Sequence, residues 1–211
     1  MKYTNLLVSI EGVDGSGKTS LVESLEAFGY QKFIEIPKHI DSRVAEQDEL
    51  GYKIRKKLRE NNSDSEEFRI EMAYLFTEYR LQYQRRLHLA LEESNVIIDR
   101  GILSTMVYGY SKNEEANSII ANTNLSTMKP DVTIYLDIDK DTAIQRLKAR
   151  GGQSEVYKSA DVIVKNIEYF NLFIDKYREE LNIVKVNAME DKKTVLSKVL
   201  NILEDYKGYK G

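Results

Sequence analysis

The chain has 211 residues, of which 42% are hydrophobic and 31% are charged, and its net charge is −3. This composition predicts a single domain, residues 1–211, with a full core and no electrostatic basis for binding nucleic acid or an anionic membrane. The lack of cysteine excludes disulfides and thiolate metal sites, and His39 and His88 do not have zinc-site spacing. No apolar run reaches the roughly 18 residues of a membrane span, and the first strand is expected too early to leave room for a targeting peptide. We therefore expect a cytoplasmic protein.

A phosphate-binding loop is predicted near the N-terminus. Residues 12–19 match G-x-x-x-x-G-K-[ST] and follow the apolar run 5–11, which predicts a strand. A helix is predicted after the loop because apolar side chains recur there with helical spacing, at Leu21, Val22, Leu25 and Phe28. Strand, glycine-rich loop and helix in this order favour binding of a nucleoside triphosphate over the alternative, an ordinary glycine-rich turn.

The parts of this loop have different predicted contacts with the triphosphate. The glycines can adopt backbone conformations closed to other residues, so that N–H groups approach the phosphate oxygens. Lys18 is expected to reach the β- and γ-phosphates, and the Thr19 hydroxyl is expected to bind Mg²⁺. The predicted ATP-binding residues of the loop and helix start are Gly12, Asp14, Gly15, Ser16, Gly17, Lys18, Thr19 and Ser20.

The remaining predicted elements alternate between strands and helices. Further strands are predicted at 32–36, 95–99, 132–138 and 183–187. Helices are predicted at about 50–60, from a Ser63–Glu66 capping box to about Glu93, in two pieces within 101–129, from an Asp139 cap to Arg150, at about 160–180, and around 195–203. The long helix is expected to turn five side chains inward: Met72, Leu75, Phe76, Tyr79 and Tyr83. Five apolar strands separated by helices predict an α/β fold of the three-layer P-loop type, with a parallel sheet covered on both faces and a lid at about 150–160.

Two charged residues, Asp99 and Arg100, end the third predicted strand. Ligands of open α/β sheets bind beyond the carboxyl ends of the strands, so this pair is expected at the active site. Asp99 is a candidate Mg²⁺ ligand, and Arg100 is a candidate partner for an acceptor phosphate. The alternative is a salt bridge that only closes the strand end.

Polar side chains share one face of the helix predicted next. Positions 101, 104, 105 and 108 have this spacing, so Ser104, Thr105 and Tyr108 offer hydroxyls and a ring to a small polar ligand. A helix that faces the core and buries its tyrosine is the alternative.

Two further sets of arginines are candidates for nucleotide binding. Arg80 lies among aromatic residues on the long helix, which suits binding of a planar base, although a side chain that extends to the surface fits the pattern equally. Arg146 and Arg150 share a helix face before Gly151 and Gly152, which suits a lid that closes over the triphosphate. The alternative for this pair is a basic helix end that favours the helix dipole.

Together these residues resemble the motifs of thymidylate kinases. The similarity lies in residues 10–19, Leu75–Arg80, Asp99–Tyr108 and Pro130–Asp137, and it extends over about residues 5–180 in the same order. The resemblance implies the transferase reaction ATP + dTMP ⇌ ADP + dTDP, a step of nucleotide biosynthesis, with ATP as donor, Mg²⁺ as cofactor and dTMP or another deoxynucleoside monophosphate as acceptor. With the tyrosine-rich helix 64–93, it also implies a homodimer.

The resemblance gives each candidate residue a role. Lys18, Asp14, Arg100 and Arg150 would be catalytic, and Arg146 would lie along the adenine. Thr19 and Asp99 would bind the metal. The acceptor would be held by Asp14 near its 3′-hydroxyl, Arg100 at its phosphate, Arg80 and Phe76 at the pyrimidine, and Ser104, Thr105 and Tyr108 around the nucleoside.

The sequence departs from the family pattern in three places. Glu35-Ile36-Pro37, followed by Lys38, stands where the family usually has Arg-Glu-Pro. The phosphate loop contains no arginine, and residues 151–177 contain no arginine either, only the lysines Lys158, Lys165 and Lys176. Gly109 replaces the glutamine that commonly follows the pocket tyrosine.

These departures leave two other functions open. A deoxynucleoside kinase would phosphorylate a 5′-hydroxyl such as that of thymidine, with Glu35 as its base, although Asp99-Arg100 stands where such kinases have Glu-Arg-Ser. A catalytically weak nucleotide-binding module would bind ATP without transfer.

Overall fold

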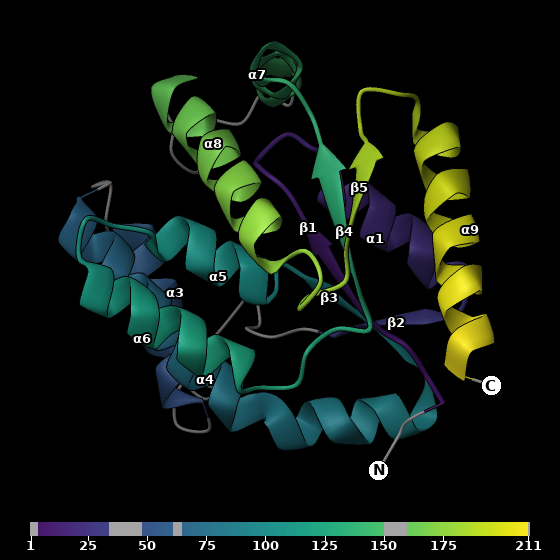
Figure 1. The fold of residues 1–211 in the computed structure, drawn as a ribbon, viewed down its shortest axis with the longest axis horizontal. Coiled ribbons are helices and arrows are strands. Elements are labelled where there is room, and N and C mark those ends of the chain that lie inside the picture. The colour runs from purple at the N-terminus through teal and green to yellow at the C-terminus, as the bar shows by residue number, and fades with distance from the viewer. Residues whose placement is uncertain (1–3, 34–47, 61–64, 150–159, 211) are drawn as a thin grey trace.

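The computed structural model describes residues 4–33, 48–60, 65–149 and 160–210 (Figure 1). The strands are β1 (Leu7–Glu11), β2 (Tyr30–Phe33), β3 (Asn95–Asp99), β4 (Val132–Asp137) and β5 (Ile183–Asn187). The helices of these ranges are α1 (Lys18–Glu26), α3 (Glu49–Glu60), α4 (Glu66–Glu93), α5 (Ile102–Gly109), α6 (Glu114–Leu125), α7 (Lys140–Ala149), α8 (Ala160–Tyr177) and α9 (Lys192–Lys210).

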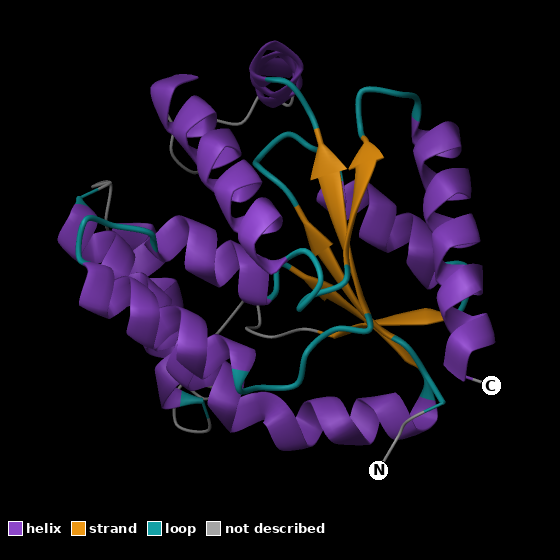
Figure 2. Cartoon of the chain, in the orientation of Figure 1, coloured by secondary structure: helices purple, strands orange, loops and turns teal. Residues whose placement is uncertain are grey.

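The strands form one twisted parallel sheet in the order β2-β3-β1-β4-β5 (Figure 2). β1 lies between β3 and β4, and Ile10 is in register with both Asp99 and Ile134. The carboxyl ends of the three central strands therefore meet at one edge of the sheet, as the sequence predicts for the fold. This edge carries the loop after β1 and the turn after β3.

Helices cover both faces of the sheet. α1 and α9 contact each other on one face, and α4, α5, α6 and α8 form a connected layer on the other (Figure 1). β1 and β4 are buried along almost their whole length, because the side chains on both sides of each strand face a layer of helices. The α4 side chains Met72, Leu75, Tyr79 and Tyr83 are buried, as predicted, in a core cluster with residues of β1, β3 and α3, whereas Phe76 is half-buried.

Two local predictions are wrong in detail. The helical spacing of Leu21, Val22 and Leu25 does not extend to Phe28, which is 56% exposed, because α1 ends at Glu26. The cap of α4 is Ser65, not Ser63: the Ser65 hydroxyl accepts a hydrogen bond from the Phe68 N–H. Both serines precede an acidic helix start, so composition alone does not separate them. Ser63 and the predicted extension of the second strand to residue 36 lie outside the described residues.

The Asp139 cap is confirmed. Its carboxylate accepts a hydrogen bond of 2.7 Å from the Thr142 N–H at the start of α7. Within the described ranges, no helix has both the length and the apolar character needed to cross a membrane.

Candidate active site

The phosphate loop adopts the backbone that its glycines make possible. Gly12, Gly15 and Gly17 have φ values of 142°, 84° and 99°, in the region that favours glycine. A Cβ atom at Gly15 would lie 2.6 Å from the carbonyl oxygen of Ala143, so the loop also approaches α7 too closely for a side chain. Local conformation and packing therefore both require glycine at Gly15.

The loop leads directly into the N-terminus of α1. Gly17 is the N-cap residue and provides no side-chain cap, and the first turn contains no acidic residue. The positive end of the helix dipole and the N–H groups that point out of a helix start favour an anion at this point. Ser16, Thr19 and Ser20 place three hydroxyl groups around the same turn.

Lys18 is folded back onto the loop. Its buried ammonium group donates hydrogen bonds of 2.9 Å to the Gly12 carbonyl and 2.8 Å to the Val13 carbonyl. Burial, together with the positive charge of Arg100, lowers the pKa of Lys18 to about 7 against the opposing effect of Asp14. An anion bound at the loop would favour the charged form of this lysine.

Arg100 joins the turn after β3 to the phosphate loop. Its guanidinium forms a salt bridge with Asp14 and donates hydrogen bonds of 2.9 Å to the Tyr108 hydroxyl and 3.2 Å to the Gly12 carbonyl. The φ of Arg100 is 71°, which is uncommon for a residue other than glycine. Such backbone strain persists where surrounding contacts hold the residue in place, and it is often found at functional sites. Arg100 is therefore in a salt bridge, as one interpretation predicted, but its partner belongs to the phosphate loop.

Oxygen atoms suited to Mg²⁺ lie on neighbouring elements of this edge. Thr19 is in the first turn of α1, and Asp99 is the last residue of β3, opposite Ile10 of β1. The described residues contain no group of three or more His, Cys, Asp or Glu side chains able to hold a metal. One carboxylate and one hydroxyl fit Mg²⁺, which commonly takes few protein ligands and completes its shell with phosphates and water.

Glu11 is a site residue that sequence reasoning missed. Its carboxylate has 0% exposure and accepts hydrogen bonds from the Gly101 N–H at 2.8 Å, from the Ser9 hydroxyl at 3.1 Å and from the Ser104 hydroxyl. It therefore ties the residue before the phosphate loop to the start of α5. The available signal was a charged residue ending an otherwise apolar strand. Ser104 is buried against Glu11, as the core-facing interpretation of α5 expected.

Arg80 is buried between α4, α5 and α6. Its exposure is 3%, so the interpretation of a side chain extending to the surface is wrong. The guanidinium donates hydrogen bonds to the Tyr83 hydroxyl at 3.0 Å, to the Thr105 hydroxyl at 2.9 Å and to the side-chain oxygen of Asn124. Sequence analysis did not single out Asn124.

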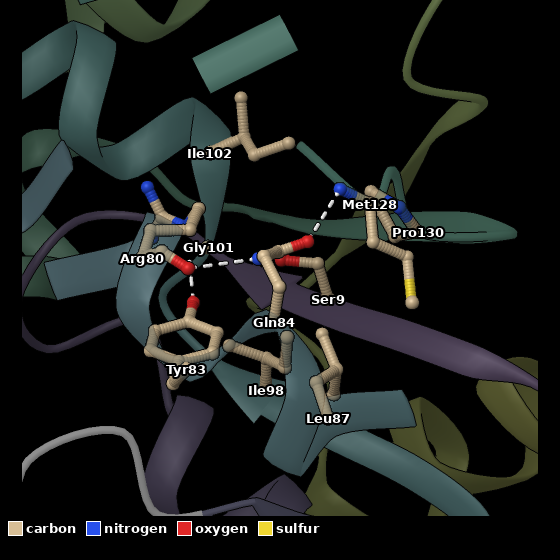
Figure 3. Close-up of a pocket in the computed structure, with 10 residues that line it drawn as sticks. All are labelled: Ser9, Arg80, Tyr83, Gln84, Leu87, Ile98, Gly101, Ile102, Met128 and Pro130. Carbon is tan, nitrogen blue, oxygen red and sulfur yellow. Dashed lines mark hydrogen bonds between the residues drawn. The ribbon is translucent and has the colours of Figure 1, made fainter. Parts of the chain in front are cut away.

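A small cavity adjoins Arg80, between α4 and the turn after β3 (Figure 3). Its volume is about 10 Å³, which suits at most one water molecule and excludes a nucleobase. Gln84, which lines this cavity, donates to the Arg80 carbonyl at 2.8 Å and accepts from the Met128 N–H at 2.9 Å. This cavity is therefore not a pocket for a base.

Comparison with known proteins identifies the family. A family model described as thymidylate kinase matches residues 10–199. The chain belongs to the thymidylate kinase family. A probable thymidylate kinase from Methanococcus aeolicus is 30% identical over 193 residues, with 90% of each chain covered. A thymidylate kinase from Wolbachia pipientis is 30% identical over 207 residues, with 96% of this chain and 97% of the relative covered.

Solved structures show the same fold. A thymidylate kinase from Candida albicans has a TM-score of 0.72 at 22% identity, covering 96% of this chain and 92% of that chain. A deoxyadenosine kinase from M. mycoides has a TM-score of 0.68 at 20% identity, covering 95% of this chain and all of that chain. These likenesses support the predicted P-loop kinase architecture.

The departure at Gly109 from the thymidylate kinase pattern has a structural reason. A Cβ atom at Gly109 would lie 2.4 Å from the Cβ atom of Ala73, because α4 and α5 cross closely at this point. In the other two departures, Glu35, Arg150 and Lys158 lie outside the described residues. Lys165 and Lys176 lie on α8, over the rings of Tyr169 and Tyr177. Arg146 is half-buried in the last turn of α7.

Proposed function

We propose that this protein transfers the γ-phosphoryl group of ATP to dTMP and so forms ADP and dTDP. Membership of the thymidylate kinase family supports the reaction. The single observation that carries it is the contact of Arg100, on the turn after β3, with Asp14 and the Gly12 carbonyl of the phosphate loop. A candidate ligand of the acceptor phosphate is thereby joined to the loop that suits the donor phosphates.

On the donor side, the loop amides and Lys18 would bind the β- and γ-phosphates. The Lys18 ammonium would exchange its hydrogen bonds to the Gly12 and Val13 carbonyls for phosphate oxygens. Ser16 and Ser20 would contribute at the start of α1, and Arg146 of α7 would lie along the adenine. Thr19 and Asp99 would hold Mg²⁺, which would neutralise charge on the phosphates.

On the acceptor side, Arg100 would bind the dTMP phosphate, and Asp14 would contact the acceptor sugar. Tyr108 orients Arg100 through its 2.9 Å hydrogen bond, and Ser104 acts indirectly by binding Glu11. Phe76 would stack on the pyrimidine, and Arg80 with Thr105 would reach its edge. The hydrogen bonds of Arg80 to Thr105 and of Arg100 to Tyr108 support this proposed pocket.

The chemistry requires alignment more than a base. An oxygen of the dTMP phosphate, already anionic, attacks the γ-phosphorus, and the bond to the β–γ bridging oxygen breaks to release ADP. Lys18 and Arg100 would stabilise charge on the transferred group, with Arg150 of the proposed lid as a third cation. No catalytic histidine is needed for this step.

The decisive experiment is an ADP-release panel with each nucleoside monophosphate and with thymidine. Release that depends on dTMP supports the proposal. Release with thymidine alone would instead support a deoxynucleoside kinase, for which the M. mycoides deoxyadenosine kinase provides a precedent for the fold only. ATP binding without turnover on any acceptor would support the nucleotide-binding module.

We also propose that the chain forms one cytoplasmic kinase domain, with a lid at about 150–160, and that it assembles as a homodimer. Tyr74, Leu81 and Leu89 are exposed along α4 at helical spacing, which suits a partner surface of the same kind. Light scattering is expected to give twice the chain mass for the wild type and a shift toward the monomer for Leu81→Glu. A monomeric wild type would contradict the dimer.

A further inference from the structure

The side chain of Asn124 is completely buried at the end of α6, and its polar atoms are engaged. Its exposure is 0%. The amide nitrogen donates to the Thr77 hydroxyl at 2.7 Å and to the Ile120 carbonyl at 2.8 Å, and the amide oxygen accepts from Arg80. These partners fix which way the amide points, because the opposite orientation would set its NH₂ group against the guanidinium.

The anchor of this amide is itself held in place. The Thr77 hydroxyl donates to the Ala73 carbonyl at 2.7 Å one turn earlier on α4, so its oxygen is turned to accept from Asn124. Asn124 thus connects α6 to two points of α4, Thr77 and Arg80. A buried polar network in which every member has a partner holds its groups in one arrangement.

Arg80 presents only hydrogen-bond donors to the groups around it. Tyr83, Thr105 and Asn124 each accept a hydrogen bond from its guanidinium, and these contacts orient it. A guanidinium only donates hydrogen bonds. At the edge of a base it therefore favours a carbonyl oxygen and disfavours an amino group.

We propose that Asn124 is a specificity-determining positioning residue that fixes the direction in which Arg80 faces the acceptor base. Through Arg80 it sets the preference for a pyrimidine with a carbonyl oxygen, as in dTMP, over one with an amino group, as in dCMP. The proposal rests on the proposed function, because it requires a pyrimidine monophosphate as acceptor. Asn124 itself is not expected to touch the nucleotide.

The test compares Asn124→Leu, of similar size, with the matched control Asn122→Leu on the exposed side of α6. Loss of a hydrogen bond to a charged group predicts that kcat/KM for dTMP relative to dCMP falls by about tenfold or more in Asn124→Leu. The change is expected in the KM for dTMP, with the KM for ATP within about twofold of the wild type. Asn122→Leu is expected to leave all three quantities unchanged.

The outcomes separate the proposal from the function. A lower melting temperature with an unchanged dTMP to dCMP ratio would show that Asn124 only stabilises the fold, and it would overturn the proposal while the kinase function stands. A wild type that turns over no pyrimidine monophosphate would contradict both. If Asn124→Leu does not fold, Thr77→Val removes one anchor of the amide and is expected to lower the ratio a few-fold, and an unchanged ratio there overturns the proposal.

Discussion

The crossing of α4 and α5 gives the sharpest prediction about stability. Gly109→Ala would place a methyl group 2.4 Å from the Cβ atom of Ala73, whereas ordinary contacts lie at 3.4–4 Å, so the helices must separate by about 1 Å. Overpacking of this kind costs about 1–3 kcal/mol. Alanine gains at most about 1 kcal/mol over glycine within a helix, and Gly109 is the last residue of α5, so the clash outweighs the gain.

We therefore expect Gly109→Ala to lose about 1–2 kcal/mol of unfolding free energy, which is about 2–8 °C in Tm for a chain of this size. Thermal and urea unfolding measure the loss. Gly208→Ala is the matched control, because Gly208 lies in α9 with nothing within 4 Å of the point that the new methyl group would occupy, and it is expected to be neutral or stabilising.

A double-mutant cycle tests the stated cause. Ala73→Gly removes the opposing methyl group, so the double variant is expected to be more stable than the sum of the two single changes by about 1–2 kcal/mol. Because the crossing also sets the distance between Arg80 and Thr105, Gly109→Ala is expected to raise the KM for dTMP more than that for ATP. Additive free energies, or a Gly109→Ala variant as stable as the wild type, would refute the packing argument.

Three further predictions concern the site. The pKa of Lys18 is about 7 in the folded protein against 10.5 for an ordinary lysine, so above pH 7 the unfolded chain binds one more proton than the folded chain. The unfolding free energy of the wild type should therefore rise relative to that of Lys18→Met between pH 7 and 10. Denaturant unfolding at both pH values measures this difference, and a difference that stays equal or falls would contradict the prediction. Glu11→Gln weakens the acceptor for the Gly101 N–H, so it should lower the unfolding free energy by about 1–2 kcal/mol and lower kcat/KM. Full activity at wild-type stability would contradict the role of this carboxylate. Arg100→Lys keeps the positive charge but cannot contact Asp14 and Tyr108 at the same time, so kcat/KM for dTMP should fall about a hundredfold. The KM for ATP should be nearly unchanged in the same steady-state assay.

The fold and the phosphate loop were predictable because their signals are local. The order of apolar strands and helices, and the glycines of residues 12–19, depend on neighbours in the sequence. The predicted strand at 183–187 and the Asp139 cap agree with the structure for the same reason.

The contacts that complete the site were not predictable because they join distant segments. Glu11 binds the N–H of a residue 90 positions away, and Asn124 binds Arg80 across 44 positions. Neither residue type identifies its partner without the packing of α5 and α6. Gly109 was visible as a departure, but its cause, the methyl group of Ala73, belongs to a different helix.

The role proposed for Arg100 and the phosphate loop is tested by ADP release from the wild-type protein with ATP, Mg²⁺ and either dTMP or thymidine. If Arg100 and the loop join an acceptor phosphate to the donor, ADP forms with dTMP, and thymidine without a phosphate gives none. ADP formation with thymidine alone, or no transfer to dTMP despite ATP binding, would contradict that role.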